Sequence, residues 1–129
     1  LENNILIVTG GPGTGKTTVA RIMASYLKDA GCIKENKIIE CDGNTLRGSA
    51  PGEGSQKADI LVKKSMGGIL FIDEAYAIAE SPYGIECIAT LIKAMEDYRD
   101  DLVVILAGYR VEMLKFLDYQ NMKKSLMLI

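Results

Sequence analysis

The sequence of 129 residues predicts an α/β fold, in which helices cover a parallel sheet. Short apolar runs alternate along the chain with longer segments whose apolar residues recur at helical spacing, as they do in consecutive strand–helix–strand units. Three of these runs, residues 5–8, 69–72 and 102–106, consist wholly of Ile, Leu, Val and Phe, which is typical of strands buried on both faces. The length and the 48% of hydrophobic residues fit a single domain over residues 1–129.

The expected elements follow one another in a regular order. Strands are predicted at residues 5–8, 37–41, 69–72 and 102–106, and residues 125–129 are either a fifth strand or a frayed end. Helices are predicted at residues 17–30, 55–66, 83–98 and 111–117, and residues 42–54 form a loop rich in Gly, Asn, Ser and Pro. The first helix is expected to bury a face made of Val19, Ile22, Met23, Tyr26 and Ala30.

A glycine-rich segment separates the first predicted strand from the first helix. Residues 10–17 read GGPGTGKT and match G-x-x-x-x-G-K-[ST], the pattern of a loop that binds the phosphates of a nucleotide. Glycines let backbone N–H groups converge on phosphate oxygens, and the helix N-terminus adds positive charge there. Lys16 is expected to reach the β- and γ-phosphates, and the Thr17 hydroxyl to ligate Mg²⁺. The predicted nucleotide contacts are Gly11, Pro12, Gly13, Thr14, Gly15, Lys16, Thr17 and Thr18.

Two carboxylates follow the third predicted strand. Asp73 and Glu74 would lie at the rim of the sheet, where open α/β folds bind their ligands. Asp73 is expected to hold Mg²⁺ through water, because this ion keeps several of its waters. Glu74 would polarise the water that attacks the γ-phosphate. The alternatives are a solvated acidic helix start and a small-molecule kinase, but a kinase does not need this adjacent glutamate.

Four segments resemble the AAA+ ATPases, and more narrowly the group of red-type rubisco activase and stage V sporulation protein K. They are residues 9–21 (TGGPGTGKTTVAR), 67–77 (GGILFIDEAYA), 91–97 (LIKAMED) and 99–109 (RDDLVVILAGY). The resemblance implies a P-loop NTPase αβα sandwich, with a parallel sheet in the order 5-1-4-3-2. It also implies ATP as the nucleotide, hydrolysis at the subunit interfaces of a homo-oligomeric ring, usually a hexamer, and a chaperone-like action on a client protein.

The resemblance further implies a water-orienting polar residue at the end of the fourth strand, which is Tyr109 or a neighbour. An ordinary half-buried tyrosine is the alternative for that position. The chain departs from the family in having Ala50 near the place of the pore-loop aromatic residue, and in having no Arg in residues 121–126 (NMKKSL), where an arginine finger is expected. The C-terminal helical lid is also absent, so a truncated core or a degenerate homologue is expected.

The sequence therefore favours an ATPase core that remodels a partner protein and hydrolyses ATP weakly when isolated. The alternative is a nucleotide-binding interaction module with little or no hydrolysis. A net charge of −2 gives no indication of nucleic acid, and no apolar run approaches a membrane span. Three Cys without His do not suggest zinc, and they favour reduced thiols in a cytoplasmic setting.

Overall fold

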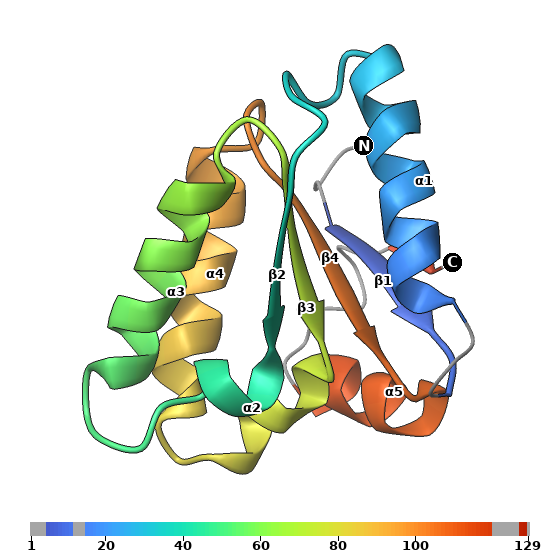
Figure 1. Cartoon of the computed structure of the whole chain (residues 1–129). Helices are drawn as coiled ribbons and strands as arrows, with labels where there is room; N and C mark the ends of the chain where they lie inside the picture. Colours follow the sequence, from blue (N-terminus) through green and yellow to red (C-terminus); the bar gives the residue numbers. More distant parts are fainter. Residues whose placement is uncertain (1–4, 12–14, 120–126, 129) are drawn as a thin grey trace.

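A computed structural model describes residues 5–11, 15–119 and 127–128, which form one parallel sheet (Figure 1). Its strands are β1 (Ile5–Thr9), β2 (Ile38–Asp42), β3 (Ile69–Asp73), β4 (Val103–Gly108) and β5 (Met127–Leu128). They lie in the order β2-β3-β4-β1-β5, and each neighbouring pair is parallel. This is the predicted order 5-1-4-3-2 read from the other edge, so the predicted fold class is confirmed.

The three central strands are buried on both faces, as their apolar composition predicts. Along β4, Val103, Ile105 and Ala107 point into one core, whereas Val104 and Leu106 point into a second core on the opposite face. This alternation follows from the two-residue period of a strand. The sheet is therefore the middle layer between two separate hydrophobic cores.

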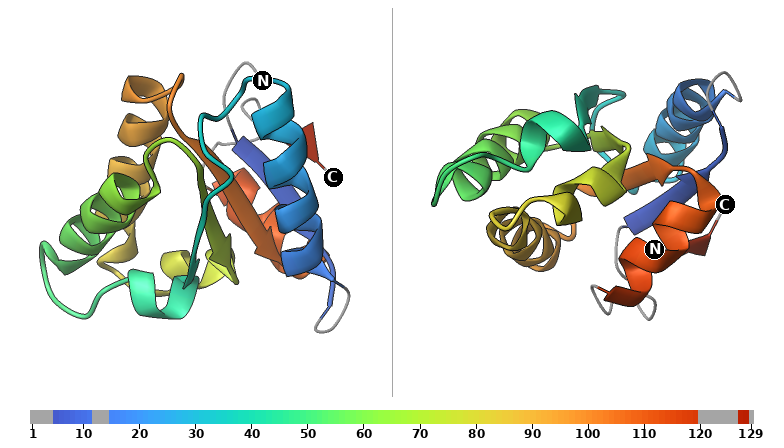
Figure 2. Two further views of the ribbon diagram at one scale, coloured as in Figure 1. Left: turned by 45° about the horizontal axis from the view of Figure 1, so that its top comes forward. Right: turned by 90° about the horizontal axis from the view of Figure 1, so that it is seen from below.

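Helices close both cores and give the αβα sandwich (Figure 2). Helix α1 (Lys16–Asp29) covers one face alone, whereas α3 (Glu53–Ser65), α4 (Gly84–Asp97) and α5 (Arg110–Tyr119) contribute to the core on the other face. Right-handed crossovers between parallel strands require such helices on both faces. None of the helices in the described part of the chain is long and apolar enough to cross a membrane.

The buried face of α1 differs from the predicted one. Ile22 and Tyr26 are 64% and 70% exposed, while Ala20, Ala24 and Leu27 are buried against the sheet. Val19 and Met23 are half-buried at the border of the two faces, and Ala30 is exposed. Both sets recur at helical spacing, and small alanine side chains let the helix approach the sheet closely. The prediction was wrong for Ile22 and Tyr26, whose large apolar side chains lie on the solvent side of the helix.

Two short helices lie in segments whose apolar residues show no helical spacing. Helix α2 (Gly43–Leu46) lies within the predicted loop, with Asp42 as its N-cap and Leu46 buried. A 3₁₀ helix, η1 (Ala75–Glu80), follows β3 directly and buries Ala75, Ala77 and Ile78. Each is too short to show a recognisable period. Elsewhere the observed ends differ from the predicted ones by about two residues or fewer, the usual uncertainty of helix and strand ends.

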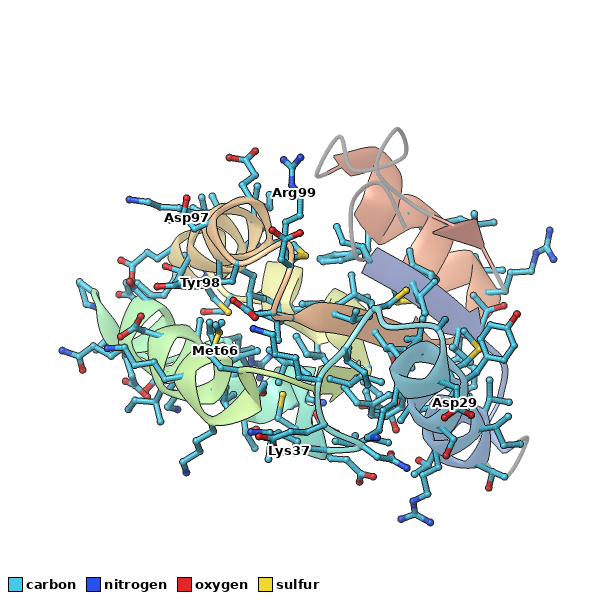
Figure 3. All side chains as sticks on the ribbon, turned by 90° about the horizontal axis from the view of Figure 1, so that it is seen from above. Asp29, Lys37, Met66, Asp97, Tyr98 and Arg99 are labelled. Carbon is cyan, nitrogen blue, oxygen red and sulfur yellow. The ribbon has the colours of Figure 1, made fainter. Side chains whose placement is uncertain are left out.

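The loops that carry Lys37, Met66 and Tyr98 lie together at the amino edge of the sheet (Figure 3). Backbone hydrogen bonds connect the loops at this edge. The Gly67 carbonyl accepts hydrogen bonds from the N–H groups of Lys34 and Glu35, both at 2.9 Å, and the Gly67 N–H donates to the Asp101 carbonyl at 2.6 Å. Lys34 and Asp101 also form an ion pair. This edge is closed by the protein's own loops, so the opposite, carboxyl edge is the one that is built to receive a ligand.

Candidate active site

The glycine-rich loop connects the carboxyl end of β1 to the amino end of α1, as predicted. The Gly10 N–H donates to the Gly108 carbonyl at 3.1 Å, which anchors the start of the loop on the neighbouring strand β4. Gly15 has a φ of 86°, a left-handed conformation that favours glycine, and α1 begins at the next residue. The first N–H groups of α1 have no partner within the helix, so the positive end of the helix dipole lies at this edge of the sheet. Pro12, Gly13 and Thr14 lie outside the described residues.

Lys16 joins the loop to the ends of two other strands. Its ammonium donates to the Gly10 carbonyl at 3.0 Å and lies 3.8 Å from the Asp73 Oδ1 atom. It also lies 5.6 Å from the centre of the Tyr109 ring, a cation–π distance. With its side chain only 12% exposed, Lys16 is held in this position by the surrounding residues. Residues 16, 73 and 109 are far apart in the sequence, and the carboxyl edge of the sheet brings them together.

The two predicted carboxylates occupy the end of β3. Asp73 is the last residue of the strand, and its Oδ1 atom accepts the Glu74 N–H at 2.9 Å. Glu74 has φ 48° and ψ 46°, and it is the one residue other than glycine with a positive φ in the described part of the chain. A left-handed conformation costs such a residue roughly 1–2 kcal/mol. The sharp turn at Glu74 directs its side chain away from the path of the strand.

Asn44 is a site residue that the sequence analysis missed. Its Nδ2 atom donates to Glu74 Oε2 and to Asp42 Oδ1, each at 2.9 Å, and its backbone N–H donates to Asp42 Oδ1 at 2.7 Å. Register places Asp42 beside Asp73 across the β2–β3 pair. Asn44 therefore holds the Glu74 carboxylate by a direct hydrogen bond. An Asn in a polar loop carries no sequence signal of such a role, because its partner is 30 positions away.

Tyr109 follows β4 directly and lies beside the glycine-rich loop. A Cβ atom added to Gly11 would lie 3.7 Å from the Cε1 atom of Tyr109. The Tyr109 carbonyl accepts a hydrogen bond from the Met113 N–H, in the first turn of α5, at 2.9 Å. The residue is 37% exposed. This position, next to Lys16 and the loop, fits the residue that the sequence analysis expected at the end of the fourth strand.

The donor groups at this edge fit a nucleotide phosphate with a bound Mg²⁺. Thr17 lies half-buried in the first turn of α1 and supplies a hydroxyl oxygen, while Asp73 supplies a carboxylate that is 40% exposed. Thr18, also predicted to contact the nucleotide, is exposed in the same turn. The described residues contain no group of three or more His, Cys, Asp or Glu that could hold a metal alone. Mg²⁺ does not need one, because it commonly binds one or two protein oxygens together with phosphates and water.

Comparison with known proteins agrees with this arrangement. The profile of the AAA family, described as "ATPase family associated with various cellular activities", matches residues 6–125. Stage V sporulation protein K of Bacillus subtilis is 45% identical over 115 residues, covering 87% of this chain and 36% of that protein. The chloroplastic ribulose bisphosphate carboxylase/oxygenase activase of Cyanidioschyzon merolae is 47% identical over 112 residues, covering 84% of this chain and 38% of that protein.

Two further matches concern a secretion protein and a solved structure. The ESX-3 secretion system protein EccA3 of Mycobacterium tuberculosis is 43% identical over 117 residues, covering 88% of this chain and 18% of that protein. The crystal structure of the FIGL-1 AAA domain in complex with ADP has a TM-score of 0.65 at 21% identity, covering 98% of this chain and 43% of that one, and so supports the fold. The chain spans well under half the length of these relatives. It belongs to the AAA family of ATPases and resembles the members named rubisco activase and stage V sporulation protein K.

Proposed function

We propose that this chain is the ATP-binding core of a longer remodelling protein, and that it hydrolyses ATP with Mg²⁺. The observation that carries the proposal is the 3.8 Å distance between Lys16 Nζ and Asp73 Oδ1 at the N-terminus of α1. A phosphate-binding cation and a metal-binding carboxylate must lie this close if one nucleotide is to contact both. Belonging to a family of ATPases supports ATP as that nucleotide.

Each residue has a role in this proposal. Lys16 and the N-terminus of α1 bind phosphate oxygens, and Lys16 exchanges its bond to the Gly10 carbonyl for one to phosphate. Thr17 and Asp73 would hold Mg²⁺, which would neutralise charge on the phosphates. Glu74 accepts a proton from the attacking water while Asn44 keeps its carboxylate oriented. Tyr109 positions Lys16 through its ring and borders the space where the γ-phosphate would lie.

We also propose that hydrolysis drives work on a client protein, within an oligomer that is a hexameric ring. The names of two relatives support a client protein, because one is an activase of ribulose bisphosphate carboxylase/oxygenase and the other is a secretion system protein. The ring rests on the resemblance to the AAA+ group alone. The three Cys are free thiols, which fits a cytoplasmic location. On this proposal an arginine finger comes from outside the present chain, since residues 121–126 contain no Arg.

The first test removes the phosphate-binding cation. Lys16→Ala should weaken ATP binding in isothermal titration calorimetry by at least about tenfold, because a hydrogen bond to a charged group contributes roughly 1.5–3 kcal/mol. Lys28→Ala, in the last turn of the same helix, is the matched control and should bind ATP like the wild type. Unchanged binding by Lys16→Ala would refute the proposed site.

The second candidate function, a binding module with little hydrolysis, is favoured by the lack of Arg in residues 121–126. Glu74→Gln separates the two, because it keeps the size of the side chain and removes its basicity. If the chain is an ATPase, the variant should bind ATP normally and turn over about a hundredfold or more slower, the usual contribution of a general base. Equal inertness of wild type and variant, with ATP binding intact, would favour the module.

A further inference from the structure

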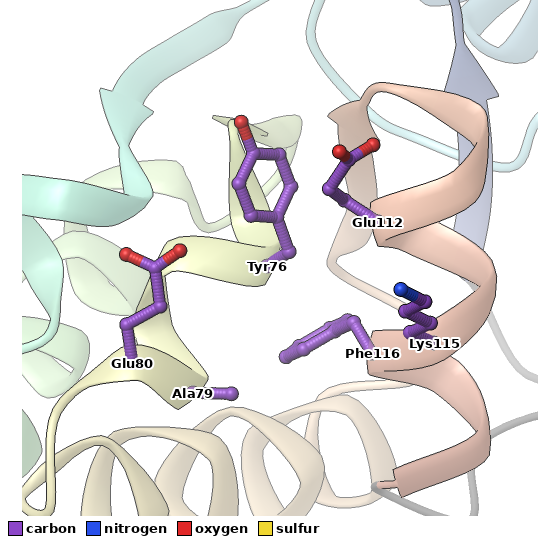
Figure 4. A pocket seen from close by; sticks show the side chains of 6 residues that line it. All are labelled: Tyr76, Ala79, Glu80, Glu112, Lys115 and Phe116. Atoms are coloured by element: carbon purple, nitrogen blue, oxygen red, sulfur yellow. The ribbon is translucent and has the colours of Figure 1, made fainter.

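A hollow of about 340 Å³ lies between η1 and α5, outside the candidate active site (Figure 4). Three of its lining residues come from η1 and three from α5, namely Tyr76, Ala79, Glu80, Glu112, Lys115 and Phe116. None of the predicted phosphate or metal ligands is among them. The hollow is open to solvent, so its chemistry can be read from these six side chains.

Aromatic and apolar groups form the floor of the hollow. Tyr76 lies on η1 and Phe116 lies across from it on α5 (Figure 4). The methyl group of Ala79, also on η1, points toward the Phe116 ring. Phe116 is buried and packs in the core beneath, and Tyr76 is half-buried against the same core, which fixes both rings. Such a floor accepts the faces of planar groups and the aliphatic part of a side chain.

The rim of the hollow offers one carboxylate that pairs with none of the residues that the structure describes. Glu80 lies on one side and Glu112 on the other, with Lys115 as the one cation of the lining (Figure 4). Glu80 already binds a guanidinium group, that of Arg47 at 3.3 Å. Glu112 forms no ion pair with any residue that the structure describes, including Lys115 one turn away. Burial raises the pKa of the Tyr76 hydroxyl, and so do the carboxylates of Glu74 and Glu112, in keeping with negative charge around the ring.

We propose that this hollow binds an arginine side chain presented by a partner polypeptide. The methylene groups of arginine would cover Ala79 and Phe116, its planar guanidinium would stack on Tyr76, and its charge would pair with Glu112. A purely apolar side chain would cover the Glu112 carboxylate without a partner, which is unfavourable. Lysine would supply the charge but not the planar group that stacks on an aromatic ring.

The inference is independent of the proposed ATPase activity, because its residues are neither phosphate nor metal ligands. It also places the partner close to the catalytic machinery, since η1 begins at the residue after Glu74. An experiment on binding can therefore succeed or fail whatever the outcome of the ATP measurements.

The test is a titration of the ¹⁵N-labelled 129-residue chain with the peptide acetyl-Ala-Arg-Ala-amide, followed by NMR. Saturable shifts are expected at the amides of Tyr76, Ala79, Glu112 and Phe116. The matched peptide with citrulline, which keeps the shape of arginine and lacks its charge, should bind at least about tenfold more weakly. Equal binding of the two peptides, or shifts centred on Asp73 and Glu74, would overturn the proposal.

Single substitutions measure how much each charged residue at the rim contributes to peptide binding. Glu112→Gln should weaken binding of the arginine peptide by about two- to fivefold, whereas Lys115→Gln should strengthen it, because it removes a repelling cation. Glu96→Gln, on the exposed face of α4, is the control for the loss of one negative charge and should leave binding unchanged. Unchanged amide spectra away from the hollow verify folding. If Glu112→Gln and Lys115→Gln both bind like the wild type, the inference is wrong.

Discussion

At the scale of single residues, Asn44 determines how the carboxylate of Glu74 is held. Its amide bridges Glu74 Oε2 and Asp42 Oδ1 at 2.9 Å each, and Asp42 also caps α2 through the Asn44 N–H. A general base must present a lone pair toward the water it activates. A carboxylate that rotates freely would spend less time in that orientation. Asn44 is therefore a positioning residue for the proposed hydrolysis.

Asn44→Ala should lower the rate of ATP hydrolysis about tenfold while leaving ATP affinity unchanged. The expected loss corresponds to roughly 1.4 kcal/mol, at the lower end of the range for a hydrogen bond to a charged group. Turnover and calorimetric binding of ATP are measured on the same preparation. Asn36→Ala removes a comparable exposed hydrogen bond, to Ser25 at the amino edge, and is the control. A faster variant would mean that Asn44 restrains Glu74 rather than orienting it.

Cys87 provides a prediction about pH. It is fully buried in the core between the sheet, α3 and α4, and burial raises the pKa of its thiol from 9.0 to about 12. The protonated thiol is favoured in the folded state, so its contribution to stability is complete below pH 9 and is lost as pH rises toward 12. Each pH unit in that window costs up to about 1.4 kcal/mol for this group.

The measurement is urea unfolding of wild type and Cys87→Ala at pH 8, 9.5 and 10.5. The variant lacks the ionisable thiol, so the difference in unfolding free energy between the two proteins should narrow as pH rises. Tyrosines and lysines titrate in both proteins and cancel in the difference. A constant difference over this range would show that the thiol ionises equally in the folded and unfolded chains.

Some residues of the candidate site could be predicted from the sequence, and others could not because their partners are distant in the sequence. Lys16, Thr17 and Asp73 could be predicted because each belongs to a local pattern with a defined chemistry. Asn44 could not, because its contact with Glu74 depends on the pairing of β2 with β3 and on the turn into α2. The 5.6 Å approach of Lys16 to the Tyr109 ring likewise depends on β1 and β4 being neighbours.

At the scale of elements, α1 shows why periodicity alone does not identify a buried face. Its apolar residues fill two adjacent stripes, and the stripe that contains Ala20, Ala24 and Leu27 lies on the sheet. A sheet flanked by one helix on this face leaves little space, so Ala20 and Ala24 set the distance between the layers. The short α2 and η1 were missed for a different reason, because four and six residues are too few to establish a period.

The two faces of α1 should differ sharply in mutational cost. Leu27→Ala should lower the unfolding free energy by about 2–5 kcal/mol, because it leaves a cavity between the helix and the sheet. Tyr26→Ala, at the neighbouring position, should change it by about 0.5 kcal/mol or less, because its side chain is 70% exposed. Urea denaturation of both variants measures the difference. If the two variants lost comparable unfolding free energy, Tyr26 would lie on the buried face of α1, as its spacing in the sequence predicted.

At the scale of the whole molecule, the apolar runs were enough to predict a buried parallel sheet. The order of its strands could be predicted only from the resemblance to a family. Any order of buried parallel strands would give the same local composition. The order matters for function, because it places β1 between β4 and β5 and β3 next to β4. The ends of β1, β3 and β4 thereby meet at the edge that carries Lys16, Asp73 and Tyr109.

The described residues at the same edge offer little positive charge near Asp73. Lys16 is the one cation that the described residues bring to Asp73, and residues 121–126 contain no Arg to stabilise charge that develops in the transition state. An arginine finger supplied from outside accelerates hydrolysis by roughly 10³–10⁵ in enzymes that use one. We therefore expect ATP binding by the isolated chain to be intact and its turnover to be weak, well below about one per second.

Turnover per chain should also stay flat as the concentration of the isolated chain is raised, because self-association alone adds no Arg from residues 121–126. Phosphate release is measured over a hundredfold range of about 0.5–50 μM, and Lys16→Ala supplies the background from contaminating ATPases. A turnover of several per second from the dilute chain would contradict the expectation, since one chain would then contain the complete site. A steep rise with concentration would also contradict it, and would assign the missing charge to another residue of a second copy.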